Sequence, residues 1–397
     1  MVLLQLLFQK KEETLKSLTN NYVTCPMKSI LHLYSENTLV SDLSALFSRT
    51  QGTIQNIGVF LPQNEGCVAT PAPELSIPLH SSPTPLDSTK HFQYDQAVRK
   101  CAAFVGQQVN LSEVSLIHAH SLLAGGTLAH VLHLQHDIPY IAAVTMEDIR
   151  FWHDNPLRSR KLLVPVLEKA TRVIFLNNNF QDFVASRLSD SDADRIFSRA
   201  LTLHNGLDPF WLQNIHIHKP VSMIHIRLLI AGDQLSPKSL PPVLKAVQLL
   251  RKRNYDVSLT VVGCAQQSAV DKDPSVRFLP SPTREGLFQI LRESDIYITP
   301  APQHATRQYY AEALSQGLPL LYDPHNGPDG LSPDGKIGYA THTQSADDLA
   351  EKILLVGERY ATIEQHITDL HPLHPFNWDE IYRGYLRVYD SVGEFRL

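Results

Sequence analysis

The chain has 397 residues, of which 43% are hydrophobic and 19% are charged. This balance is typical of a folded globular protein rather than a disordered one, and the length predicts two domains. The formal net charge of -5 argues against a protein that binds nucleic acid through a strongly basic overall charge.

The cysteines are few and widely spaced: Cys25, Cys67, Cys101 and Cys264. None of them forms a Cys-x-x-Cys pair, so we expect neither a disulfide framework nor a structural zinc site. This usage favours the reducing cytoplasm as the location. No apolar run approaches the roughly 20 residues that a membrane-spanning helix needs.

Residues 1–26 differ in pattern from the rest of the chain. Their apolar part is short, and the charges follow it rather than precede it, which argues against a signal peptide. Two interpretations stay open, an appended extension and an additional helix that packs on the first domain.

From residue 27 onward, short strand-like runs alternate with longer helical segments. The strand-like runs of the first half are SILHLY, IQNIGVFL, VSLIHAH, YIAAVT and RVIFLN. Helical spacing is found in LLAGGTLAHVLHLQHDI and RKLLVPVLEKATR. Strands that alternate with helices predict a parallel sheet that is covered on both faces.

The same alternation restarts after residue 220. The strand-like runs are RLLIAG, VSLTVVG, SVRFLP, DIYITPAP and LPLLYD, and helices are predicted at LPPVLKAVQLLRKRN, REGLFQILRES and TRQYYAEALSQ. We therefore expect an α/β domain over 27–210 and a second one over 211–375, joined by a linker near 210–223. The amphipathic pattern within 376–397 predicts a last helix that packs back towards the first domain.

Several stretches together resemble the retaining glycosyltransferases of the GT-B fold, family four (glycosyl transferases group 1). They include SLIHAHSLLAGGTLAHVLHLQHDIPYIAAVT, LEKATRVIFLNNNFQDFV, LHNGLDPFW, YYAEALSQGLPLLYD and FNWDEIYRGYLRVY, in order along the chain. The resemblance implies two Rossmann-like α/β domains that face a central cleft. It also implies transfer of a sugar from a nucleotide-diphosphate-sugar donor to a glycan, lipid-linked or other glycoconjugate acceptor, with retention of anomeric configuration.

Two charged residues stand at positions where this family binds the donor. Lys238 follows the first strand of the second domain near a helix start, where an ammonium group and helix amides would stabilise the leaving diphosphate. Gly232 would let the backbone approach the donor closely. The resemblance gives Glu312 the role of holding the ribose hydroxyls. Without it, Lys238 and Glu312 would be ordinary solvated helix residues.

The same region departs from the family pattern at three positions. The family signature has two glutamates eight residues apart, but His304 stands eight residues before Glu312. Asp233 stands where an arginine is common. Arg307 adds positive charge to the His304 loop, and we expect it to replace the missing arginine at the diphosphate.

A further departure lies in AAVTMEDIRFW, at the end of a first-domain strand. Thr145 stands where the family often has a histidine, and Glu147 and Asp148 follow as candidates for contacts with acceptor hydroxyls. Acidic residues at a helix N-terminus are also favourable for the helix itself. The candidate catalytic residues are thus His304, Thr145, Glu147 and Asp148, and the candidate donor-binding residues are Gly232, Asp233, Lys238, Arg307 and Glu312.

These residues predict a metal-independent transferase with no cofactor beyond the nucleotide sugar as co-substrate. A catalytically degenerate GT-B subunit that binds a partner protein or a glycan is the alternative, and a different GT-B activity such as nucleotide-sugar epimerisation is a third. The basic stretch RFWHDNPLRSRKLLVPVLEKATR predicts either a peripheral contact with the inner face of a membrane or an ordinary amphipathic helix. A homo-oligomer stays open.

Overall fold

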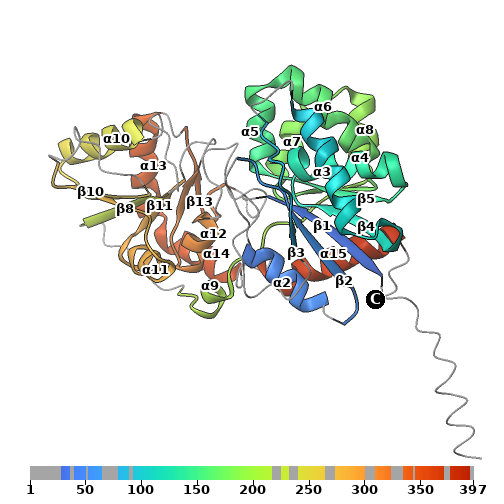
Figure 1. Cartoon of the computed structure of the whole chain (residues 1–397). Helices are drawn as coiled ribbons and strands as arrows, with labels where there is room; N and C mark the ends of the chain where they lie inside the picture. Colours follow the sequence, from blue (N-terminus) through green and yellow to red (C-terminus); the bar gives the residue numbers. More distant parts are fainter. Residues whose placement is uncertain are drawn as a thin grey trace, which may run out of the picture.

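A computed structural model of the chain describes residues 28–35, 40–50, 52–64, 79–88, 93–216, 225–231, 240–263, 273–299, 309–322, 334–342, 345–370 and 376–393. These residues form two α/β domains, each built on its own parallel sheet (Figure 1). The prediction of two Rossmann-like α/β domains is confirmed.

The N-terminal domain contains a seven-stranded parallel sheet in the order β3-β2-β1-β4-β5-β6-β7. Its strands are β1 (Ser29–Tyr34), β2 (Gln55–Phe60), β3 (Leu79–Ser81), β4 (Val114–Ala119), β5 (Tyr140–Val144), β6 (Arg172–Phe175) and β7 (Ala200–Thr202). The order turns back at the β1–β4 pair, because the chain moves outward from β1 to β3 and then crosses to β4. Ligands of open parallel sheets bind beyond the carboxyl ends of the strands at such a reversal.

Helices cover both faces of this sheet (Figure 1). One face carries α3 (Tyr94–Gln108), α4 (Thr127–His136), α5 (Met146–Asp154), α6 (Pro156–Lys169), α7 (Asn178–Ala185) and α8 (Asp190–Phe197). The other face carries α2 (Val40–Thr50) and the last helix of the chain, α15 (Trp378–Gly393). Alternate residues of the buried strands face the two layers, for example Leu31 on the first and Ile30 on the second.

The C-terminal domain contains a six-stranded parallel sheet in the order β10-β9-β8-β11-β12-β13. Its strands are β8 (His225–Ala231), β9 (Asp256–Val262), β10 (Val276–Leu279), β11 (Ile296–Ile298), β12 (Leu320–Tyr322) and β13 (Gly338–Ala340). Its helices are α10 (Leu240–Lys252), α11 (Arg284–Glu293), α12 (Tyr309–Ser315), α13 (Ala346–Glu358) and α14 (Tyr360–Asp369). Figure 1 shows α10 and α13 on one face of the sheet and α11 and α12 on the other.

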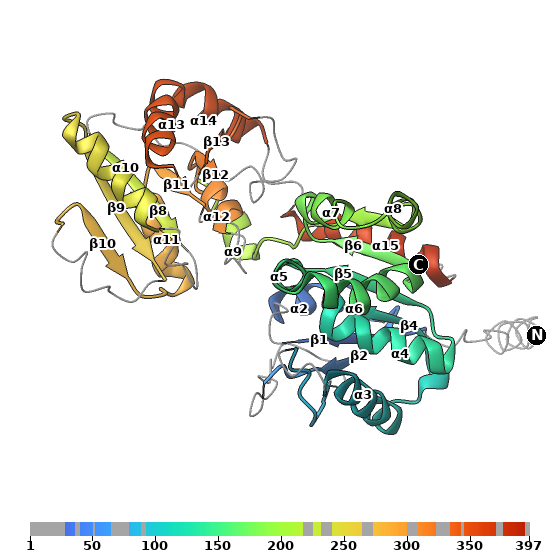
Figure 2. The ribbon, with the colours of Figure 1, turned by 90° about the horizontal axis from the view of Figure 1, so that it is seen from above.

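Two segments of the chain cross between the domains (Figure 2). The first crossing runs through the short helix α9 (Pro209–Gln213), near the predicted linker. The second leads from α14 back to α15, and the two crossings meet where the Leu207 backbone N–H donates to the Phe376 carbonyl at 2.9 Å. Trp378, Ile381 and Tyr385 of α15 are buried against the N-terminal sheet.

The basic stretch predicted as a membrane contact forms the second half of α5 and all of α6. Trp152 is buried in the domain core, and the Arg158 guanidinium donates to the Ser88 carbonyl at 2.5 Å. Leu157, Arg160 and Lys161 remain exposed, so peripheral membrane contact stays a prediction. Within the described ranges, no helix combines the length and the apolar character that a bilayer span requires.

Candidate functional site

A small pocket lies beyond the carboxyl ends of β1, β4 and β5 in the N-terminal domain. The residues that line it include Ser35, His120, Ser121, Thr145, Glu147 and Asp148. Its volume is about 30 Å³, which suits a hydroxyl group or a water molecule. A sugar ring could therefore place only a hydroxyl in this pocket and would have to lie outside it.

The floor of the pocket is shaped by the turn that follows β4. A π-helix over Leu122–Gly126 replaces the first turn of the predicted helix, and the Ser121 hydroxyl accepts from the Gly125 N–H at 3.1 Å. A Cβ atom on Gly125 would lie 3.0 Å from the Leu33 carbonyl oxygen. Glycine at this position therefore lets the turn lie directly against β1.

The Asp148 carboxylate holds the π-helix turn and the start of α5 together. Its oxygens accept from the backbone N–H groups of Leu122 at 2.9 Å and Leu123 at 2.7 Å. They also accept from the Thr145 backbone at 2.8 Å and hydroxyl at 2.9 Å, which forms a capping box at α5. Burial raises the pKa of the Asp148 carboxyl to about 6, while these hydrogen bonds oppose the shift.

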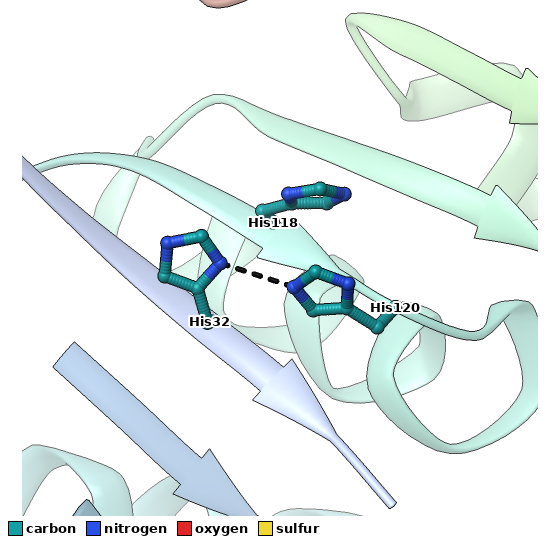
Figure 3. Close-up of side chains that lie close together, drawn as sticks. All are labelled: His32, His118 and His120. Atoms are coloured by element: carbon teal, nitrogen blue, oxygen red, sulfur yellow. Dashed lines mark hydrogen bonds between the residues drawn. The ribbon is translucent and has the colours of Figure 1, made fainter. Parts of the chain in front are cut away.

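Three histidines lie side by side next to this pocket (Figure 3). His32 of β1 and His118 of β4 are adjacent in the strand register and share one face of the sheet. His120 follows two residues later on the same side, with its ring centroid 4.0 Å from that of His118. His32 and His118 are fully buried, and His120 reaches the pocket.

A chain of hydrogen bonds fixes the proton positions on His32. The Thr50 hydroxyl donates to helix carbonyls of Leu46 and Phe47, so its oxygen accepts from the Asn56 amide at 2.7 Å. The Asn56 carbonyl oxygen therefore faces Nε2 of His32 at 2.9 Å and requires a proton on that nitrogen.

Nδ1 of a neutral His32 then carries a lone pair, which accepts from Nε2 of His120 at 3.0 Å. Burial lowers the pKa of His32 to about 4, and burial together with the neighbouring imidazoles lowers the pKa of His118 and His120 well below the usual value. The three rings are therefore neutral at neutral pH.

The structure brings only part of the predicted site together. Thr145 and Glu147 line the pocket, and Asp148 lies in its wall with its carboxylate engaged by the protein itself. Glu312 lies on α12, where it is 4% exposed. The remaining predicted site residues lie outside the described residues: Gly232, Asp233, Lys238, His304 and Arg307.

The histidine cluster was not singled out from the sequence. The signal was present as His-Ala-His at the end of a predicted strand, since residues two apart in a strand face the same side. The contribution of His32 depends on β1 and β4 being neighbours, which only the sheet order reveals.

The C-terminal domain matches a known family over residues 223–358, described as "Glycosyl transferases group 1". Residues 223–358 are therefore similar to a group 1 glycosyl transferase domain. The match spans all six strands of the C-terminal sheet and ends at the last residue of α13. Among curated proteins, none matches the chain at a significant level.

Solved structures with a similar fold cover almost the whole chain. Sucrose-phosphate synthase from Thermosynechococcus elongatus has a TM-score of 0.70 at 12% identity, over 92% of this chain and 98% of its own. HepE from Anabaena, solved with UDP and glucose, has a TM-score of 0.64 at 15% identity, over 91% of this chain and 99% of its own. At this level of identity the likeness establishes the GT-B fold alone.

The fold does not by itself select one reaction. A putative UDP-N-acetylglucosamine 2-epimerase from Listeria monocytogenes is also similar, with a TM-score of 0.57 at 11% identity over 91% of this chain and 96% of its own. The activity must therefore be argued from the residues and from the family match.

Proposed function

We propose that this protein transfers a sugar from a nucleotide-diphosphate-sugar donor to a hydroxyl of a glycan, lipid-linked or other glycoconjugate acceptor, with retention at the anomeric carbon. The observation that carries the proposal is the match of residues 223–358 to glycosyl transferases group 1. The coverage of both domains by GT-B structures supports a donor side and an acceptor side that face each other.

The donor side of the proposal lies in the C-terminal domain. The Lys238 ammonium and the Arg307 guanidinium would hold the diphosphate, whose negative charge grows as the glycosidic bond breaks. The Glu312 carboxylate would accept hydrogen bonds from the ribose hydroxyls, and His304 would bind a sugar hydroxyl. HepE was solved with UDP, which supports uridine nucleotides as the first donors to test.

The acceptor side lies at the pocket beyond β1, β4 and β5. A pocket with room for one hydroxyl, lined by the Glu147 carboxylate and the His120 imidazole, would orient an acceptor hydroxyl by hydrogen bonds. Positioning and electrostatic stabilisation would account for the rate, and the leaving diphosphate would take the acceptor proton. Asp148 acts as a positioning residue, because it fixes the turn and the helix that form this pocket.

Hydrolysis of the donor tests this proposal even though the acceptor is unknown, because water can take the place of the acceptor. The protein is incubated with UDP-, GDP- and ADP-sugars, and proton NMR follows the first anomer of the released sugar. We expect one donor to release its nucleoside diphosphate with the sugar anomer unchanged. Release of the inverted anomer would refute retention, and conversion of the donor to its epimer would identify an epimerase instead.

The matched variants are Glu312→Gln, which removes the carboxylate, and Glu351→Gln on the exposed side of α13. Glu312→Gln should reduce hydrolysis by at least tenfold and leave the fold intact, because the change is isosteric. An equal loss of hydrolysis in both variants, or no loss in either variant, would contradict the role given to Glu312.

A further inference from the structure

The three histidines beside the pocket, His32, His118 and His120, have the arrangement of a metal-ligand set. One ring nitrogen from each residue lies within 4.8 Å of those of the other two. We propose that these three imidazoles bind a divalent transition-metal ion of the zinc class. The site does not depend on the sugar-transfer proposal, because it rests only on the geometry of the N-terminal domain.

The spacing is close to that of ligands on a metal ion. Zinc–nitrogen bonds of 2.0–2.1 Å in a tetrahedral site place ligand nitrogens about 3.4 Å apart. Nδ1 of His32 and Nε2 of His120 lie 3.0 Å apart, so these rings need to separate by only a few tenths of an ångström. The His118 ring, tilted over His120, contributes the third nitrogen, which lies within 4.8 Å of the other two.

The surroundings orient the rings as the second shell of a metal site does. Asn56 accepts from Nε2 of His32 and leaves the Nδ1 lone pair directed at His120. The Tyr389 hydroxyl lies 2.9 Å from Nδ1 of His118. Hydrogen bonds of this kind fix the tautomer and the orientation of metal-bound histidines.

One buried nitrogen points to a missing ligand. Nε2 of His118 is buried and has no hydrogen-bond partner among the described residues. A buried polar atom without a partner costs roughly 1–3 kcal/mol, and a bound cation would engage it. A metal ion would displace the proton that His120 now donates to His32.

A metal ion held here would keep a coordination position on the pocket side. Three histidine ligands leave a fourth tetrahedral position, as in zinc sites that bind water or substrate. His120 lines the pocket together with Ser35 and Ser121. Imidazole ligands without carboxylates favour zinc, copper, nickel or iron over magnesium and calcium.

The experiment uses the full-length protein after treatment with EDTA and removal of the chelator. Isothermal titration with Zn²⁺ should give one ion per chain, and Co²⁺ should give the intense visible absorption of a four- or five-coordinate site. Mg²⁺ should give neither signal. Absence of stoichiometric Zn²⁺ binding by the folded protein would overturn the proposal.

Substitutions locate the ion. His120→Ala changes the ligand nearest the solvent and should weaken Zn²⁺ binding by at least 100-fold, while Asn56→Leu should weaken it by roughly 10- to 100-fold. His225→Ala, an exposed histidine of the C-terminal domain, should bind as the wild type does. Unchanged affinity in a folded His120→Ala protein would place the ion elsewhere and refute the assignment.

Discussion

The Tyr389 hydroxyl lies 2.9 Å from Nδ1 of His118, although the two residues are 271 positions apart in the chain. The contact places the last helix of the protein directly over the histidine cluster at the end of β4. Helix α15 is also tied to α2, since the Arg49 guanidinium lies 3.0 Å from the Asp379 carboxylate and the Tyr382 hydroxyl donates to the Arg49 carbonyl. The C-terminal helix therefore completes the N-terminal domain.

Removal of the Tyr389 hydroxyl should destabilise this domain. In Tyr389→Phe, His118 Nδ1 loses its partner in a buried site, which should cost about 1–3 kcal/mol of unfolding free energy. Tyr382→Phe is the matched control, because its hydroxyl binds a carbonyl near the surface and should cost less than about 1 kcal/mol. Urea unfolding of both variants measures the difference, and a larger loss in Tyr382→Phe would contradict the buried role of Tyr389.

Substitutions at Asp148 and Glu147 should have different effects, the first mainly on stability and the second mainly on activity. Asp148→Asn replaces a carboxylate that accepts four hydrogen bonds and should lower the unfolding free energy by about 2 kcal/mol or more. Glu147→Gln should leave stability within about 0.5 kcal/mol of the wild type while it lowers donor turnover with an acceptor present. Thermal unfolding and turnover are measured on the same preparations. A larger loss of stability in Glu147→Gln than in Asp148→Asn would contradict these roles.

The histidine cluster should make the metal-free protein sensitive to acid. The folded-state pKa of His32 is about 4, below the unfolded value near 6.5. The unfolded state therefore binds more protons in this window, so stability is lost as the pH falls below 6.5. His118 and His120 shift in the same direction. Asp148 acts in the opposite direction, because its folded-state pKa is raised to about 6. Between pH 4 and 6 the folded state therefore holds a proton on Asp148 that the unfolded state does not, which offsets the effect of one of the three histidines.

Each uncompensated proton corresponds to about 1.4 kcal/mol per pH unit. Urea unfolding of EDTA-treated protein from pH 7.5 to pH 5 should show falling stability, with a shallower slope in His32→Gln. A wild-type slope of zero or of the opposite sign would be inconsistent with neutral buried imidazoles.

Gly338 should be among the most sensitive positions of the C-terminal domain. Its φ is +140°, and a Cβ atom would lie 1.8 Å from the Leu320 carbonyl oxygen, so Gly338→Ala should disrupt the β12–β13 pair and cost more than about 3 kcal/mol. A Cβ atom at Gly106, an exposed position of α3, would meet only the Leu111 side chain at 3.8 Å in Gly106→Ala. This substitution should raise stability by about 0.5–1 kcal/mol, and calorimetry of both variants checks the contrast.

The sequence predicted those elements whose apolar pattern is local and strong. SILHLY became β1 with the expected bounds, and REGLFQILRE became α11, because β-branched runs and amphipathic spacing are visible in one short window. The three-residue strands β3, β7 and β13 were not predicted. β13 (Gly338–Ala340) begins with a glycine because a Cβ atom at this position would clash with β12. This requirement comes from a neighbouring strand, so it is not visible in the local sequence pattern.

The candidate site was less visible for the same reason. The sequence identified Glu147 and Asp148 as a pair, but the two carboxylates have different roles because Asp148 accepts from backbone groups 25 and 26 residues away. Backbone donors carry no side-chain signature, so no pattern could separate the two residues. The π-helix turn at Leu122–Gly126 likewise depends on its contact with β1.

Nucleotide binding tests the central claim most directly. Thermal unfolding of the purified protein is followed with UDP, GDP, ADP, CMP and their sugar conjugates. A ligand at 100 times its Kd should stabilise the fold by about 2.7 kcal/mol. We predict a clear shift with one nucleotide, lost in Lys238→Ala and Glu312→Gln but kept in Lys245→Ala on the exposed face of α10. A cooperatively folded protein that none of these nucleotides stabilises would contradict a working donor site and indicate a GT-B subunit that has lost catalysis.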